Sequence, residues 1–90
     1  MIKERLIEIL KHEEIKNPKL EELTGISRYT WQNIRNKPER EIKEEEIDAI
    51  ANLFKEYRFW LISGEEMPEA GQVSPMTKAA QSELGTQRKA

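Results

Sequence analysis

Residues 27–36, with the sequence SRYTWQNIRN, present hydrogen-bonding side chains around a narrow apolar stripe. Trp31 and Ile34 are three residues apart, so a helix would turn both toward the interior. The hydrogen-bonding side chains left on the surface of that helix are Arg28, Tyr29, Thr30, Gln32, Asn33 and Arg35. Guanidinium and amide groups can each bond two neighbouring atoms of a partner at once, which suits recognition of a polar surface. Because any solvated helix carries some of these groups, the surrounding elements decide whether the segment binds a partner.

Residue patterns for catalysis or metal binding are not found. The chain has no cysteine, which excludes disulfides, thiolate metal sites and cysteine nucleophiles. His12 is the only histidine, whereas a zinc site needs three or four well-spaced ligands. Ser27 and Ser63 have no general base at motif spacing, and the carboxylates are dispersed. We therefore expect no enzyme activity, no metal and no cofactor.

The size and composition of the chain indicate one small domain. A chain of 90 residues is too short to divide its core between two units. Its 37% apolar and 36% charged residues are typical of a globular protein. No stretch approaches the ~18 apolar residues of a membrane span, and the N-terminus lacks the apolar region of a secretory signal. These features predict a cytoplasmic protein with no membrane partner.

Charge is unevenly distributed along the chain, although the net charge is only −2. Residues 27–43 carry five Lys or Arg against two Glu, a balance of +3. Residues 44–66 carry two Lys or Arg against seven Asp or Glu, a balance of −5. A basic segment followed by an acidic one can orient a molecule toward a polyanion, with the acidic side facing away.

The apolar pattern predicts an all-α fold of five helices. Apolar residues recur at intervals of three and four, and no segment sustains a period of two. Asn17-Pro18 is a start signal, in which Asn17 caps free N–H groups and Pro18 takes the first helical position. Negative charge at Glu44-Glu45-Glu46 suits the first turn of a later helix. The expected helices are residues 2–13, 17–24, 27–36, 44–54, and a short one that holds Tyr57, Trp60 and Leu61 and closes at Ser63-Gly64.

A turn at Thr24-Gly25 separates the second helix from the third. Glycine adopts the left-handed conformation that ends a helix at little steric cost, and Ser27 can cap the helix that follows. Two short helices joined in this way, the second exposing hydrogen-bonding side chains, form a shape that fits the major groove of DNA.

The turn and its helices resemble the lambda-repressor-like (Cro type) helix-turn-helix family. The matching residues are Leu20, Gly25, Ile26, Trp31, Ile34 and Asn36. The resemblance covers residues 2–64 in five helices, and residues 60–65, WLISGE, are similar to the family's usual ending. The stretch from Pro68 to Pro75 is also similar to the tails of small phage-type regulators.

Three residues depart from the family's pattern. Glu21 stands where alanine is usual, Thr24 where an aliphatic residue is usual, and Lys37 where glycine often ends the recognition helix. Either the two helices pack at an altered angle, or Leu23 supplies the missing contact.

The resemblance implies which residues contact DNA. The positions that face base edges correspond to Ser27, Arg28, Tyr29, Thr30 and Asn33. Their chemistry is suitable, because arginine can bond guanine O6 and N7 together, asparagine can do the same for adenine, and threonine can meet a thymine methyl. The phosphate-contact candidates are Asn17, Asn36, Lys37, Arg40 and Lys43. As alternatives, Tyr29 could pack over the turn, and Arg28 and Asn33 could bind water or phosphate.

The chain after Gly64 is expected to be a tail. Residues 65–90 contain few large apolar groups, too few for independent stability. We expect a domain of residues 1–64 followed by a flexible tail that is largely disordered or forms one short helix from Ser74-Pro75 through Met76, Ala79, Ala80 and Leu84.

Two functional hypotheses follow. The first is a sequence-specific regulator of transcription, a repressor, that binds double-stranded DNA as a homodimer, with residues 27–36 in the major groove. Its dimer surface would be formed by Tyr57, Phe59 and Ile62 or by the tail. The alternative is an interaction module, such as an antitoxin-like or adaptor protein, that keeps the helix-turn-helix shape and binds a protein.

Overall fold

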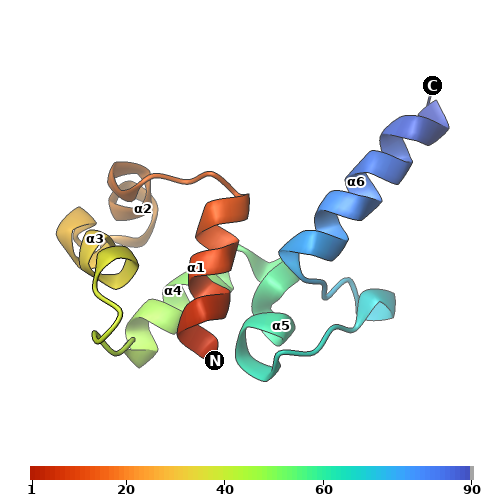
Figure 1. Ribbon diagram of the computed structural model, residues 1–90. Coiled ribbons are helices and arrows are strands. Elements are labelled where there is room, and N and C mark those ends of the chain that lie inside the picture. Colours follow the sequence, from red (N-terminus) through yellow and green to blue (C-terminus); the bar gives the residue numbers. More distant parts are fainter. Residues whose placement is uncertain (90) are drawn as a thin grey trace.

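The computed structural model describes the backbone of residues 1–89 and the side chains of residues 1–82, and the described backbone is helical (Figure 1). Its elements are α1 (Ile2–His12), α2 (Asn17–Thr24), α3 (Arg28–Asn36), α4 (Glu44–Leu53), the 310 helix η1 (Lys55–Tyr57), α5 (Arg58–Ser63), the 310 helix η2 (Pro68–Ala70) and α6 (Pro75–Lys89). Residues 1–89 contain no β-strand, and only an isolated bridge joins Met67 to Gln72. The predicted all-α fold is confirmed, with one α-helix more than the five expected.

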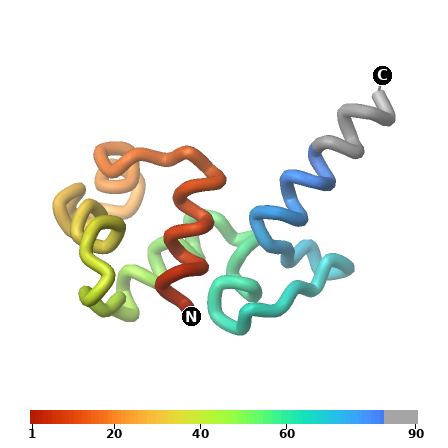
Figure 2. Tube along the Cα trace, in the orientation of Figure 1, coloured from red at the N-terminus to blue at the C-terminus, as the bar shows by residue number. Residues whose placement is uncertain are grey.

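The helices surround one apolar core. In Figures 1 and 2, α1 and α4 lie at the centre, α2 and α3 pack together at one end, and α5 lies at the other end, from which α6 leads away. The buried apolar residues come from every part of this arrangement: Leu6, Ile9, Leu10, Leu20, Trp31, Ile34, Ile50, Ala51, Tyr57, Leu61 and Val73. Because α3 contributes only two of these residues, its other faces point away from the core.

Glycine ends α2 and α5, as the sequence predicted. Gly25 has φ of 77° and Gly64 has φ of 79°, both in the left-handed region that favours glycine. Gly25 N–H donates to the carbonyl of Glu21 at 2.8 Å, which closes the last turn of α2. The chain can therefore change direction sharply between α2 and α3.

The start of α2 differs from the prediction. Lys16 is the residue before the helix, in extended conformation, and Asn17 is the first helical residue. Asn17 therefore does not cap the helix with its side chain, and the predicted cap is wrong. The start signal was still correctly located, because Pro18 lies in the first turn of α2, where a missing N–H breaks no hydrogen bond.

The first turn of α4 contains a buried carboxylate. Of its expected apolar stripe, Ile50 and Ala51 are buried, and Ile47 and Phe54 pack against the core while partly exposed. Glu46, however, is also buried. Its neighbours Glu44 and Glu45 are exposed and place negative charge on the first turn, as expected.

Residues 65–78 pack against the domain that was expected to end at Gly64. Val73 is buried in the core, and its N–H donates to the carbonyl of Glu56 at 2.9 Å. The Gln72 side chain joins the same region, since its Oε1 accepts from Phe59 N and its Nε2 donates to the Lys55 carbonyl. Of the two expectations for the tail, the structure has the helix, α6, which is longer than expected; the side chain of Leu84 lies outside the described residues.

Lys78 fastens α6 to the rest of the fold. Its Nζ lies 2.8 Å from Glu56 Oε2 and 3.1 Å from Glu13 Oε2. Glu13 also accepts a hydrogen bond from the hydroxyl of Tyr57, whose ring lies under the Lys78 ammonium group. The pKa of Lys78 is raised chiefly by Glu56, so this contact is charged at neutral pH.

Candidate nucleic-acid interface

The outer face of α3 gathers the residues that the sequence singled out for base contacts. Ser27 caps the helix, with its Oγ accepting from Tyr29 N at 3.2 Å. Trp31 and Ile34 are buried, and this orientation turns the opposite face outward. Tyr29 is 69% exposed, which leaves its ring free of the turn. Ser27 and Arg28 are exposed as well, while Thr30 and Asn33 are partly exposed on the same short helix.

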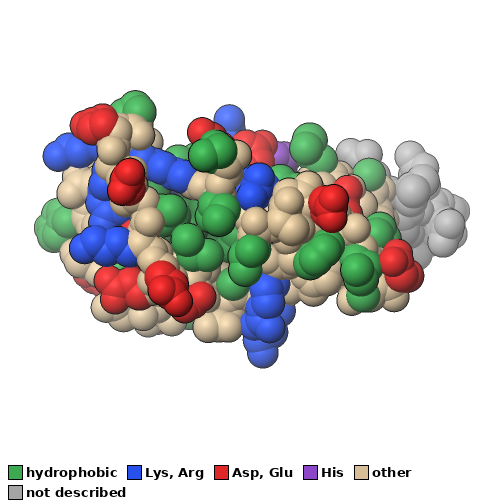
Figure 3. Space-filling view, turned by 90° about the horizontal axis from the view of Figure 1, so that it is seen from below, with side chains coloured by type: hydrophobic (Ala, Val, Ile, Leu, Met, Phe, Trp, Pro, Cys, Tyr) green, Lys and Arg blue, Asp and Glu red, His purple; other side chains and the backbone are tan. Residues whose placement is uncertain are grey.

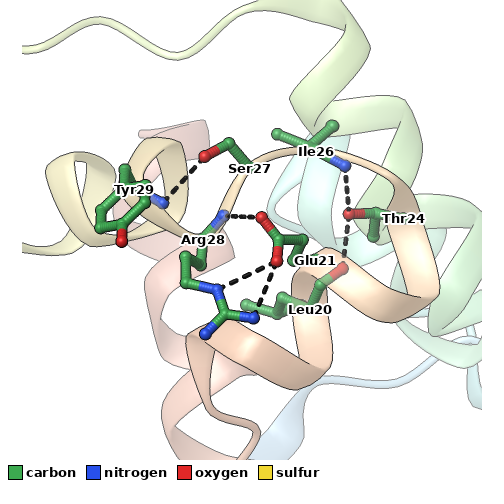
Figure 4. A network of polar contacts seen from close by, with 7 residues as sticks. All are labelled: Leu20, Glu21, Thr24, Ile26, Ser27, Arg28 and Tyr29. Carbon is green, nitrogen blue, oxygen red and sulfur yellow. Dashed lines mark hydrogen bonds and ion pairs between the residues drawn. The ribbon is translucent and has the colours of Figure 1, made fainter.

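Polar contacts replace the apolar packing usual at the turn (Figure 4). Thr24 Oγ1 donates to the Leu20 carbonyl at 2.6 Å and accepts from Ile26 N at 3.1 Å. Glu21 Oε2 accepts from Arg28 N at 3.0 Å and so joins α2 to the first turn of α3. Leu23 is 47% exposed and does not supply the missing contact. Two of the departures at the turn are therefore explained by hydrogen bonds across it.

Glu21 also holds the side chain of Arg28. Its Oε1 lies 3.0 Å from Arg28 Nε and 2.9 Å from Nη2 (Figure 4). The hydrogen bond from Arg28 N, followed by those from the guanidinium, lowers the pKa of Glu21, so the carboxylate is ionised at neutral pH. Arg28 thus lies on the exposed face with part of its guanidinium already bound.

The end of α3 and the loop after it carry three exposed phosphate-contact candidates. Asn36, Lys37 and Lys43 are exposed, and neither lysine forms an ion pair with any side chain that the structure describes. Lys37 follows α3 in extended conformation, with φ of −115°, which explains why glycine is not needed there. From α1, Lys3 Nζ donates to the carbonyls of Lys37 and Arg40 at 2.7 and 2.6 Å. These hydrogen bonds hold the loop against α1, and the sequence did not predict them.

Arg40, the fourth candidate in this region, is engaged inside the protein. Its Nη2 lies 2.8 Å from Oε2 of the buried Glu46, and its side chain is only 22% exposed. The sequence predicted a phosphate contact for Arg40, and the geometry shows that this side chain also joins the loop to α4. Arg35 is likewise used internally, because its Nη2 donates to the Ile15 carbonyl.

Asn17 lies half-buried at the start of α2. Its Oδ1 is buried and has no hydrogen-bond partner among the described residues. Lys16, immediately before it, is exposed and adds a positive charge at this helix N-terminus. Sequence reasoning did not single out Lys16, although its position beside Asn17 was a usable signal.

Several Lys and Arg side chains lie on the surface near α3, but acidic side chains beside them offset part of the positive charge (Figure 3). In Figure 3, Lys and Arg side chains gather at the end of the molecule that holds α2 and α3, with Asp and Glu side chains beside them. Of the five cationic residues in residues 27–43, the three arginines are engaged by Glu21, by Glu46 and by the Ile15 carbonyl. The two lysines are therefore the main cations of this segment available to a polyanion.

The described part of the chain contains neither a membrane-spanning helix nor a cluster of metal ligands. No helix there has the length and apolar character needed to cross a bilayer. The same residues hold no group of three or more histidine, aspartate or glutamate side chains placed to bind a metal ion.

The fold and the exposed face of α3 define a helix-turn-helix DNA-binding protein. Residues 5–56 match the Cro/C1-type HTH DNA-binding domain, and the chain belongs to this family. The chain is also similar to the structure of Pf6r from the filamentous phage Pf6 of Pseudomonas aeruginosa PA01, with 38% sequence identity and a TM-score of 0.80. That similarity covers 93% of this chain and 96% of Pf6r. Comparison with curated proteins gave no match.

These comparisons confirm the family that the sequence indicated. The protein is a DNA-binding regulator with a Cro/C1-type domain.

Proposed function

We propose that the protein is a transcriptional repressor that binds a specific sequence of double-stranded DNA as a homodimer in the cytoplasm. In this proposal α3 enters the major groove, and Ser27, Arg28, Tyr29, Thr30 and Asn33 contact the bases. Asn17, Asn36, Lys37 and Lys43 contact phosphates. Arg40 remains a phosphate candidate in this proposal, and its ion pair with Glu46 also positions the loop.

The observation that carries the proposal is the exposed face of α3 directly after the glycine turn. Trp31 and Ile34 fix the rotation of the helix, and Ser27 fixes its first residue. Hydroxyl, guanidinium and amide groups are thus presented together on one face of a short helix, from which base edges can be read. Similarity to a phage protein over nearly the whole chain supports a regulator of this kind.

The dimer proposal rests on the area available to one domain. A single domain of this type offers about 600–1,000 Å² to DNA, so specificity is usually gained by a symmetric pair on half-sites ~34 Å apart. Ile62, at the end of α5, is 53% exposed, and Phe59 lies on the same helix, partly exposed. Tyr57, which the sequence included in this surface, is instead part of the core. We therefore propose α5, at Phe59 and Ile62, as the dimer surface.

DNA binding is tested by selection of bound fragments from random duplex DNA, followed by titration of the selected site at several salt concentrations. Affinity should fall steeply between about 50 and 200 mM salt, because several phosphates are neutralised. Arg28→Ala and Asn33→Ala should relax sequence preference and leave the helical circular dichroism spectrum intact. A flat salt response, or no selected site, would instead favour a protein partner.

The dimer is tested by light scattering of the purified protein, free and on its selected site. Ile62→Asp places a charge on the proposed surface and should shift the protein to a monomer with weaker operator binding. Leu23→Asp is the matched control, since Leu23 is similarly exposed but lies on α2. If the two variants changed the molar mass of the free protein equally, α5 would be ruled out as the dimer surface.

A further inference from the structure

The carboxylate of Glu21 uses both oxygens across the turn between α2 and α3. Oε2 accepts the backbone N–H of Arg28 at 3.0 Å, while Oε1 lies 3.0 Å from Nε and 2.9 Å from Nη2 of the same residue. Backbone and side chain of Arg28 are therefore held by one group (Figure 4). This contact fixes the direction in which the guanidinium leaves the helix.

The contact selects which N–H groups of Arg28 remain available. A guanidinium has five N–H groups in one plane. The Nε and Nη2 side faces Glu21, which leaves both hydrogens of Nη1 and the second hydrogen of Nη2. One hydrogen from each terminal nitrogen forms the fork that matches O6 and N7 of guanine.

The charge of Glu21 disfavours the competing phosphate contact. An ionised carboxylate beside the guanidinium cancels much of its positive charge and repels a phosphate at the same place. The edge of a guanine carries no net charge, so it meets less repulsion and still accepts two hydrogen bonds. Both side chains remain partly exposed, 46% for Arg28 and 36% for Glu21, so a groove can reach them.

We propose that Glu21 is a positioning residue that directs Arg28 to a guanine base in the major groove and away from the phosphate backbone. This inference rests on the proposed function. Holding the side chain in advance removes part of the rotamer entropy that an arginine otherwise loses on binding. Glutamate at this position departs from the family's pattern. It thereby determines the preferred base pair at one position of the operator.

The test measures base discrimination with Glu21→Ala. The selected operator is first scanned with Arg28→Ala to find the base pair whose preference is lost. Affinities are then measured for guanine, adenine and 7-deazaguanine at that position. The wild type should prefer guanine by about tenfold or more. Glu21→Ala should reduce this preference to about threefold or less, and should have no further effect on preference in the Arg28→Ala background.

Glu22→Ala is the matched control, because it removes the same charge one residue away. Glu22 is exposed, and in the described part of the chain its carboxylate forms one ion pair, in which Oε2 lies 3.6 Å from Lys19 Nζ. It should leave the preference for guanine unchanged. Thermal unfolding of all variants checks that the fold is kept.

Two results would overturn the inference while leaving the proposed function intact. In the first, Glu21→Ala binds the operator with the full preference for guanine. In the second, it binds guanine and adenine operators more tightly by the same factor, which would make Glu21 a competitor for Arg28. If the wild type selects no duplex DNA at all, the proposed function itself has failed.

Discussion

Arg40 and Glu46 form a two-point ion pair between the loop after α3 and the first turn of α4. Nη2 of Arg40 lies 2.8 Å from Oε2 of Glu46, and Nη1 lies 3.0 Å from Oε1. Glu46 Oε1 also accepts from Lys43 N at 2.9 Å, and its side chain is only 2% exposed. The pair therefore satisfies a buried charge and fixes the loop that leads from α3 to the core.

Arg40→Ala should lower the free energy of unfolding by about 3 kcal/mol, because it leaves the Glu46 carboxylate buried without its counter-ion. Urea denaturation followed by circular dichroism measures the loss. Glu39→Ala, which removes an exposed neighbour in the same loop, should change stability by less than about 0.5 kcal/mol. A similar small effect of Arg40→Ala would show that the ion pair is dispensable.

The same pair should make stability depend on pH in the acid range. Burial raises the pKa of Glu46, but hydrogen bonds from Arg40 and Lys43 N outweigh it, and the net pKa lies below its ordinary value. A lowered folded pKa means that the contribution is present above the unfolded pKa of about 4.5 and is lost as pH falls through the folded value. Urea midpoints at about pH 7, 5 and 3 should therefore fall less for Glu46→Gln than for the wild type. A larger fall in the variant would contradict this sign.

The sequence was sufficient to locate the helices and the exposed face of α3. Apolar spacing identified Trp31 and Ile34 as buried, and Gly25 and Gly64 do end their helices in left-handed conformation. These features are local, because a helix face or a helix end depends on residues within about one turn. Local patterns therefore gave the fold and the candidate surface.

The pairing of charges could not be predicted in the same way. Residues 27–43 have a balance of +3, but a sum does not show that Glu21 binds Arg28, or that Glu46 binds Arg40. Nor does composition show that Val73 is buried, since one valine in a polar segment gives no periodicity. These contacts depend on how distant elements pack, which is decided by the whole core.

The glycine at the turn should be replaceable only with a loss of stability. Gly25→Ala should lower the free energy of unfolding by about 1–2 kcal/mol, through the left-handed backbone alone, because a Cβ would meet nothing within 4 Å. Glu14 is the reciprocal case, since it is a non-glycine residue with φ of 54°. Glu14→Gly should raise stability by about 0.5 kcal/mol, once the extra entropy of the unfolded chain is subtracted. Thermal unfolding measures the stability of both variants. A change of the same sign in both would show that backbone strain is not the cause.

Residues 65–78 should contribute to the stability of the domain. Val73→Ala removes the equivalent of two buried methylenes and should lower the free energy of unfolding by about 1.5 kcal/mol. A chain that ends at Gly64 should lose more, because the contacts of Gln72 and Lys78 go with Val73. Equal midpoints for the chain that ends at Gly64 and the full-length chain would support the boundary at Gly64 that the sequence predicted.

Lys37 and Lys43 should bind DNA differently from the residues on α3. Because a phosphate contact carries no sequence information, Lys37→Ala or Lys43→Ala should weaken binding to selected and random DNA by a similar factor. Each should also reduce the slope of log affinity against log salt concentration by about 0.9, the value for one phosphate contact. Lys55→Ala removes an exposed charge from η1, in the acidic segment, and should leave the slope unchanged. Fluorescence anisotropy at four salt concentrations measures all three slopes, and a loss of sequence preference with a constant slope would instead place these lysines at the bases.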